Sequence, residues 1–92
     1  MIPDEQEFIY NIASGLADDV INKLRKAEEY FREDIDVTEK CVVMHHLTVC
    51  KLLADFVLVM EGVSELTSKE LFTILHDDTI KLVTKLKEQD GR

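Results

Sequence analysis

The chain has 92 residues, of which 46% are hydrophobic and 33% are charged, and its formal net charge is −8. A chain of this length holds one modest core, which excludes a two-domain enzyme with an interdomain cleft. It contains only three glycines and one proline, so it lacks the turn residues of a multistranded sheet, and we expect an all-α fold.

The first predicted helix covers residues 4–33. One stripe of apolar residues recurs along it at helical spacing, which is typical of a helix with one buried face. The stripe consists of Ile9, Ile12, Ala13, Leu16, Val20, Leu24, Ala27 and Phe31.

Acidic residues are concentrated in the same part of the chain. Residues 1–36 carry ten acidic and four basic residues, a net charge of −6. This charge disfavours direct binding to nucleic-acid phosphates and favours a basic protein partner. The predicted interaction face consists of Asp18, Asp19, Glu28, Glu29, Glu33 and Asp34. The same acids also fit a solvated helix face with local ion pairs, such as Glu29 with Arg32.

The second predicted helix covers residues 37–61 and is expected to stop at Gly62. Its apolar arc spans roughly 260° of the circumference, against about 100° for an ordinary surface helix. Two flanking helices cover only part of that arc, so the surplus predicts a homodimer. The candidate dimer surface consists of Cys41, Val49, Leu52, Phe56 and Val59.

The stretch CVVMHHLTVC, residues 41–50, contains the residue types of a metal or redox site. Cys41 and His45 are four residues apart, as are His46 and Cys50, so each pair shares a helix face. A metal-binding or redox protein is therefore the first alternative, although cysteine on an apolar arc is usually a core residue. We find no pattern for nucleophilic catalysis or a phosphate loop, and we expect neither an enzyme nor a cofactor.

The third predicted helix covers residues 68–89 and starts from a capping box, Thr67 with Glu70. Similar pairs, Asp4 with Glu7 and Asp36 with Glu39, are expected to start the first two helices. Short connections make sequential helices antiparallel, so residues 1–92 are predicted to form a single helical domain. Its arrangement is up-down-up, completed as a helical-bundle homodimer.

The sequence also predicts a location and a class of function. No secretory signal opens the chain, and the most apolar stretch, residues 52–60, is nine residues long and contains Asp55, so we expect a cytoplasmic protein without a membrane span. The predicted function is that of a non-enzymatic protein–protein interaction module. Its specific form is a small acidic inhibitor or immunity-type protein, phage-type antagonists included, and a structural assembly subunit is the second alternative.

Overall fold

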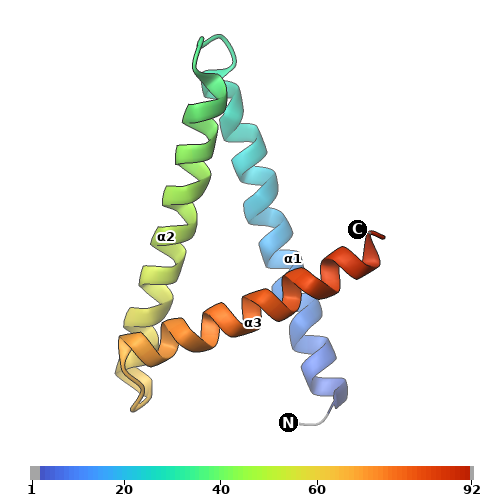
Figure 1. The fold of residues 1–92 in the computed structure, drawn as a ribbon, viewed down its shortest axis with the longest axis vertical. Coiled ribbons are helices and arrows are strands. Elements are labelled where there is room, and N and C mark those ends of the chain that lie inside the picture. Colours follow the sequence, from blue (N-terminus) through green and yellow to red (C-terminus); the bar gives the residue numbers. More distant parts are fainter. Residues whose placement is uncertain (1–2, 92) are drawn as a thin grey trace. The chain divides into compact units, whose positions relative to one another are not determined.

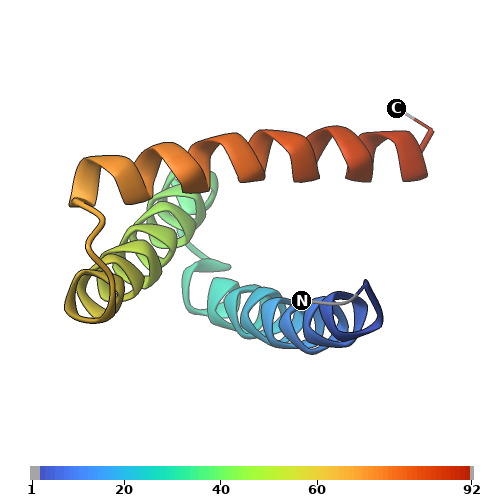
Figure 2. The same ribbon diagram turned by 90° about the horizontal axis from the view of Figure 1, so that it is seen from below.

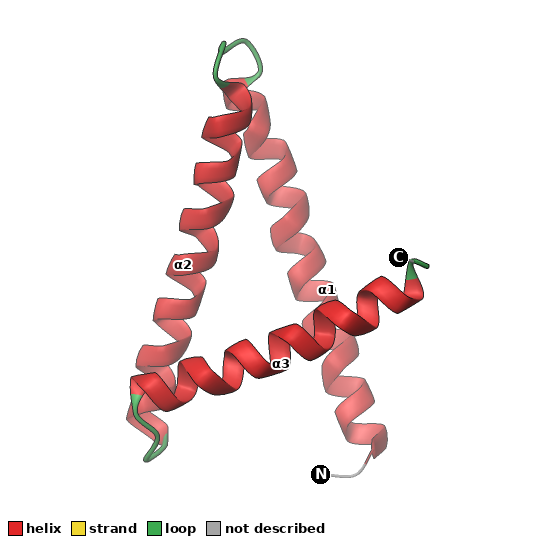
Figure 3. Cartoon of the chain, viewed as in Figure 1, coloured by secondary structure: helices red, strands yellow, loops and turns green. Residues whose placement is uncertain are grey.

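Three α-helices follow one another in the computed structural model, which describes residues 3–91 (Figure 1). They are α1 (Pro3–Ala27), α2 (Val37–Val63) and α3 (Ser68–Gln89), and a short 3₁₀ helix, η1 (Glu28–Phe31), follows α1. Residues 3–91 contain helices, turns and loops but no strand (Figure 3). The predicted all-α fold with three helices is therefore confirmed.

The first helix ends earlier than the predicted residue 33. The α-helical pattern stops at Ala27 and tightens into η1, where Arg32 N–H donates to Glu29 O at 3.3 Å. Asp34 N–H then donates to Phe31 O at 2.9 Å, which continues the turn toward α2. Tight i to i+3 turns of this kind are common at helix C-termini, because they satisfy carbonyls that the α-helix leaves free.

The second helix passes through Gly62 and ends at Val63, so the predicted stop at Gly62 is wrong. The last turn is closed by Ser64, whose N–H and hydroxyl both donate to Met60 O, at 2.9 and 2.7 Å. Both donors of Ser64 therefore satisfy the Met60 carbonyl where the helix ends, and Gly62 inside the helix keeps helical geometry.

The third helix starts as predicted. Glu70 N–H donates to Thr67 Oγ1 at 3.2 Å, and Thr67 N–H donates to Glu70 Oε1 at 3.2 Å, so the capping box is complete. The other two predicted boxes are not formed. Asp4 lies inside the first turn of α1, and the Asp36 carboxylate is 3.3 Å from the Lys40 amine.

The chain divides into two compact units between Thr48 and Val49, inside the continuous helix α2. In the first unit, α1 and the start of α2 meet at the η1 turn and diverge from it (Figure 1). The α1 stripe is half-buried near that turn, at Leu24 and Phe31, but Leu16, further from it, is exposed. No described residue of this unit is fully buried.

The second unit contains the end of α2 and all of α3, which runs as one uninterrupted helix (Figure 2). Val57 and Leu71 are its buried residues, and Leu53 and Leu75 are half-buried. The C-terminal half of the α3 stripe is exposed, at Leu82, Val83 and Leu86. As in the first unit, the helices cover each other only next to their connection.

This pattern leaves a large area of apolar surface accessible to water. In the first unit Leu16 is 62% exposed, and in the second unit Leu86 is 45% exposed.

Replacement of Thr67 by Ala is expected to lower the free energy of unfolding by about 1 kcal/mol, because Ala cannot accept the Glu70 N–H at the start of α3. Thr67→Ser keeps the hydroxyl and should behave like the wild type. Urea titrations followed by circular dichroism at one protein concentration compare the three proteins. A Thr67→Ser protein that is destabilised as much as Thr67→Ala would contradict a stabilising role of the cap.

Candidate interaction surfaces

The η1–α2 turn is organised around one lysine. The amine of Lys40 lies 2.8 Å from the Asp34 carboxylate and 3.3 Å from that of Asp36, and 6.0 Å from the centre of the Phe31 ring. The hydrogen bonds that the Lys40 amine donates to Asp34 and then to Asp36 raise the pKa of Lys40 above its ordinary value. All three charged side chains remain partly open to solvent, so this cluster fixes the geometry of the turn more than it stabilises the fold.

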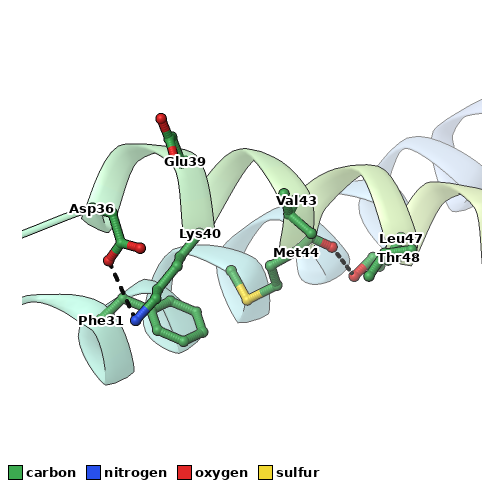
Figure 4. Close-up of a pocket in the computed structure, with 8 residues that line it drawn as sticks. All are labelled: Phe31, Asp36, Glu39, Lys40, Val43, Met44, Leu47 and Thr48. Atoms are coloured by element: carbon green, nitrogen blue, oxygen red, sulfur yellow. Dashed lines mark hydrogen bonds and ion pairs between the residues drawn. The ribbon is translucent and has the colours of Figure 1, made fainter. Parts of the chain in front are cut away.

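An open groove of about 650 Å³ lies beside this cluster, and we call it the turn groove (Figure 4). Its apolar part is formed by Phe31, Val43, Met44 and Leu47, and its polar part by Asp36, Glu39, Lys40 and Thr48. The Glu39 carboxylate projects away from the Phe31 ring (Figure 4). Sequence reasoning missed the groove, because the η1 turn that supplies Phe31 was expected to be α-helix.

A second contact joins η1 to α2 on the other side of the turn. His45 Nε2 lies 2.9 Å from Glu28 Oε1, and both side chains are about 40% exposed. Cys41 lines the same shallow pocket and is half-buried. Loss of hydration and then the Glu28 charge raise the pKa of the Cys41 thiol. The structure therefore places Cys41 beside η1, apart from the more exposed apolar residues with which it was grouped.

The other four residues of the predicted dimer surface are exposed along the middle of α2. We call them the central apolar set, and their exposed fractions are 51% for Val49, 50% for Leu52, 43% for Phe56 and 64% for Val59. They recur at intervals of three or four, so they form one stripe. Nothing in the described residues buries this stripe.

The predicted acidic face is partly used by local contacts. Glu28 meets His45, Glu29 and Glu33 lie 3.2 and 3.8 Å from the Arg32 guanidinium, and Asp34 meets Lys40. Asp18 and Asp19, in α1, are exposed and have no ion pair within residues 3–91. Local contacts therefore engage part of the predicted face, and Asp18 and Asp19 are its members without an ion pair in the described residues.

The candidate metal ligands do not form one cluster within a single chain. Across residues 3–91, no group of three or more His, Cys, Asp or Glu side chains is arranged to hold a metal ion. His45 is engaged with Glu28, and His46 and Cys50 lie exposed one turn apart on α2. A four-ligand site would need the His46 and Cys50 pair from two copies.

Among the described helices, α2 is long and apolar enough to cross a membrane by length and composition. It has 27 residues and a mean hydropathy of 1.7 over its most apolar window, of which 6% is buried. The core helix of a soluble protein can have the same length and hydropathy, so these two values do not distinguish it from a membrane span. The high hydropathy and low burial identify α2 as the helix with the most apolar surface exposed to water.

Comparison with known protein families, curated proteins and solved structures finds no match for this chain. The function is therefore argued from the surfaces described above.

The raised pKa of Cys41 predicts slow alkylation. In a Cys50→Ser protein at neutral pH, iodoacetamide should react with Cys41 more slowly in the folded chain than in urea, because less thiolate is present. The folded-state rate should rise with pH until the raised pKa is passed. Glu28→Gln removes one cause of the shift and should speed the reaction. Glu29→Gln, which removes the same charge next to it, is the matched control, and an equal effect of both changes would contradict the assignment.

Proposed function

We propose that this chain is a non-enzymatic protein–protein interaction module that works as a homodimer with α2 at its centre. The observation that carries the proposal is the exposed central apolar set. Contiguous apolar patches of this kind are uncommon on soluble monomers and mark surfaces that bind another protein. A second copy is the simplest partner, because a two-fold axis lets one patch cover itself.

A homodimer would also supply the buried apolar surface that the single chain lacks. Ordering a residue costs about 1–2 kcal/mol of backbone entropy, which burial of apolar surface must offset. Val57 and Leu71, the buried residues of the described chain, offset little of this cost. In the proposed dimer, residues 1–92 form one helical domain in which sequential helices run antiparallel and the second copy completes the bundle.

The proposed dimer is cytoplasmic, although α2 has the hydropathy of a membrane span. Lys51 and Asp55 form an ion pair of 2.8 Å near the middle of α2 and are both more than half exposed. Each such residue costs about 2.5–3.5 kcal/mol at the centre of a membrane helix. In a soluble dimer the same pair stays in water while the central apolar set, centred about 100° away around the helix, is covered.

The narrower role that we propose is that of a small acidic inhibitor or immunity-type protein that docks on a basic protein. Asp18 and Asp19 support this role, because they are exposed and lack an ion pair within the described residues. Unpaired surface acids attract a basic partner and speed its approach. Glu29 and Glu33 are also open to solvent beside Arg32, and they extend the same acidic surface.

The metal-binding alternative would use the same dimer. His46 and Cys50 from each copy could supply four ligands if the two-fold axis passed beside them. Cys41 and His45 would have to give up their contacts with η1, so the site would depend on the other pair. The assembly-subunit alternative shares the self-association and differs only in having no further partner.

The homodimer predicts a mass of twice 10.6 kDa at micromolar concentration, measured by sedimentation equilibrium. Leu52→Glu places a charge in the central apolar set and should weaken self-association by at least about 30-fold. The matched control is Leu58→Glu, because Leu58 is also exposed but lies six residues further along α2, roughly 120° around the helix. It should change the dissociation constant by no more than a few-fold.

Two results would contradict the dimer. One is a monomeric mass for the wild type across this concentration range. The other is retention of the untagged chain in the membrane pellet after a high-pH wash, which would favour the membrane-spanning use of α2.

If the acidic surface docks on a basic protein, the immobilised chain should capture that protein from an extract of the cells that produce it naturally. Moderate salt should release the captured protein. A variant with Asp18, Asp19, Glu29 and Glu33 changed to Lys should lose that protein. Asp77→Lys with Asp78→Lys, which reverses two exposed acids in α3, is the control and should retain it. Equal recovery by all three proteins would exclude this surface as the docking site.

A further inference from the structure

The turn groove is formed by residues of the first unit alone. Two of its apolar side chains, Phe31 and Met44, are half-buried, whereas Val43 and Leu47 are 55% and 60% exposed. An open groove with exposed apolar side chains can take up apolar side chains of a partner, and one helix lying in such a groove is a recurrent mode of protein recognition.

The charged residues at the groove make it acidic. The Lys40 amine lies 2.8 Å from the Asp34 carboxylate and 3.3 Å from that of Asp36, so these three residues carry a net charge of −1. Glu39 also lines the groove, and it has no ion pair within the described residues. Its carboxylate projects away from the Phe31 ring, at the edge of the groove (Figure 4). This edge therefore attracts a basic side chain and repels an acidic one.

The length of the groove fits a short stretch of helix. Its α2 lining runs from Glu39 to Thr48, which is about 14 Å along the helix axis. Apolar residues at positions i, i+4 and i+7 of a bound helix would span about 10 Å. A helix with three such residues can therefore cover Val43 and Leu47 while a neighbouring basic residue reaches Glu39.

We infer that the turn groove binds an amphipathic helix of a basic partner protein, whose apolar residues pack on Phe31, Val43 and Leu47 and whose lysines or arginines lie beside Glu39. This inference rests on the proposed function as an interaction module that docks on a basic protein, and it adds the site that receives the partner's apolar residues. The apolar contact supplies the affinity, and the acidic edge selects a basic helix over an acidic one of the same shape.

Two synthetic peptides test the groove. Each is a helix of about four turns with Leu, Phe and Leu at positions i, i+4 and i+7. One peptide has lysines beside these residues, and the other has glutamates in their place. At low salt, the labelled lysine peptide should bind the full chain at least about fivefold more tightly than the glutamate peptide, measured by fluorescence anisotropy. In NMR spectra of the chain, the lysine peptide should shift the backbone amide signals of Val43 and Leu47.

Matched substitutions of apolar residues locate the binding. Leu47→Asn should weaken binding of the lysine peptide at least about tenfold, because it removes an apolar contact in the groove. The control is Val42→Asn, because Val42 is 62% exposed on the same helix but lies roughly 140° around it from Leu47. This control should change the dissociation constant by less than about twofold.

A charge reversal gives a second readout that misfolding cannot imitate. Glu39→Lys should weaken binding of the lysine peptide about threefold to tenfold and strengthen binding of the glutamate peptide, because it reverses the charge at the edge of the groove. Asp78→Lys reverses an exposed acid of α3 and is the matched control. It should change the affinity for either peptide by less than about twofold.

Three results would overturn the inference. One is peptide binding that neither Leu47→Asn nor Glu39→Lys changes. Another is no binding to the wild type but clear binding once Lys81, Lys85 and Lys87 are changed to Glu, which would show that α3 of this chain or of a second copy occupies the groove. The third is no binding to either protein.

The inference and the proposed function can fail separately. A basic protein that wild type and Leu47→Asn capture equally from an extract, together with no peptide binding, would overturn the groove and leave the acidic docking surface standing. Peptide binding that Leu47→Asn abolishes, with no basic protein captured, would support the groove and overturn the acidic docking surface.

Discussion

The main constraint on this structure is that contacts within the chain leave much of the apolar surface of its helices exposed. The connections between helices are short, residues 32–36 and 64–67, so neighbouring helices are held together at one end. Burial follows the same pattern, because Leu24 and Phe31 are covered beside one turn and Leu71 and Leu75 beside the other. Further from each turn, the apolar stripes of the described residues are exposed, for example at Leu16 and Leu86. In the proposed homodimer, the matching stripes of a second copy would cover them.

Electrostatic contacts around the η1 turn complement this incomplete packing. The pair of Lys40 with Asp34 joins α2 to the connection after η1, and the pair of His45 with Glu28 joins α2 to η1 itself. Such partly exposed pairs contribute little stability, but they restrict the direction in which the chain leaves η1. They thereby hold Phe31 next to Val43 and Leu47 and form the turn groove. In this way, acids that the sequence assigned to partner binding are used to shape a groove.

Helical periodicity and capping chemistry were sufficient to predict most of the fold. The ranges 37–61 and 68–89 agree with α2 and α3 to within two residues, since apolar spacing and the Thr67–Glu70 box are local signals. The break at Ala27 was missed, because residues 28–31 continue the apolar stripe and the 3₁₀ turn depends on how the chain reverses. The exposure of Leu52 and Phe56 followed from counting apolar circumference. The positions of Cys41 and Glu28 could not be predicted, because their contacts join η1 to α2 across the turn.

Charge distribution would further restrict how the two copies of the proposed homodimer meet. Each copy has a net charge of −8, concentrated in residues 1–36, so two first segments placed face to face would repel. The C-terminal half of α3 is the part of the chain where lysines outnumber acids beside an exposed apolar stripe. An arrangement of the proposed homodimer in which the two first segments lie apart would lower this repulsion. In the proposed homodimer, the central apolar set would then supply most of the affinity, and the charges would select against arrangements that bring the two first segments together.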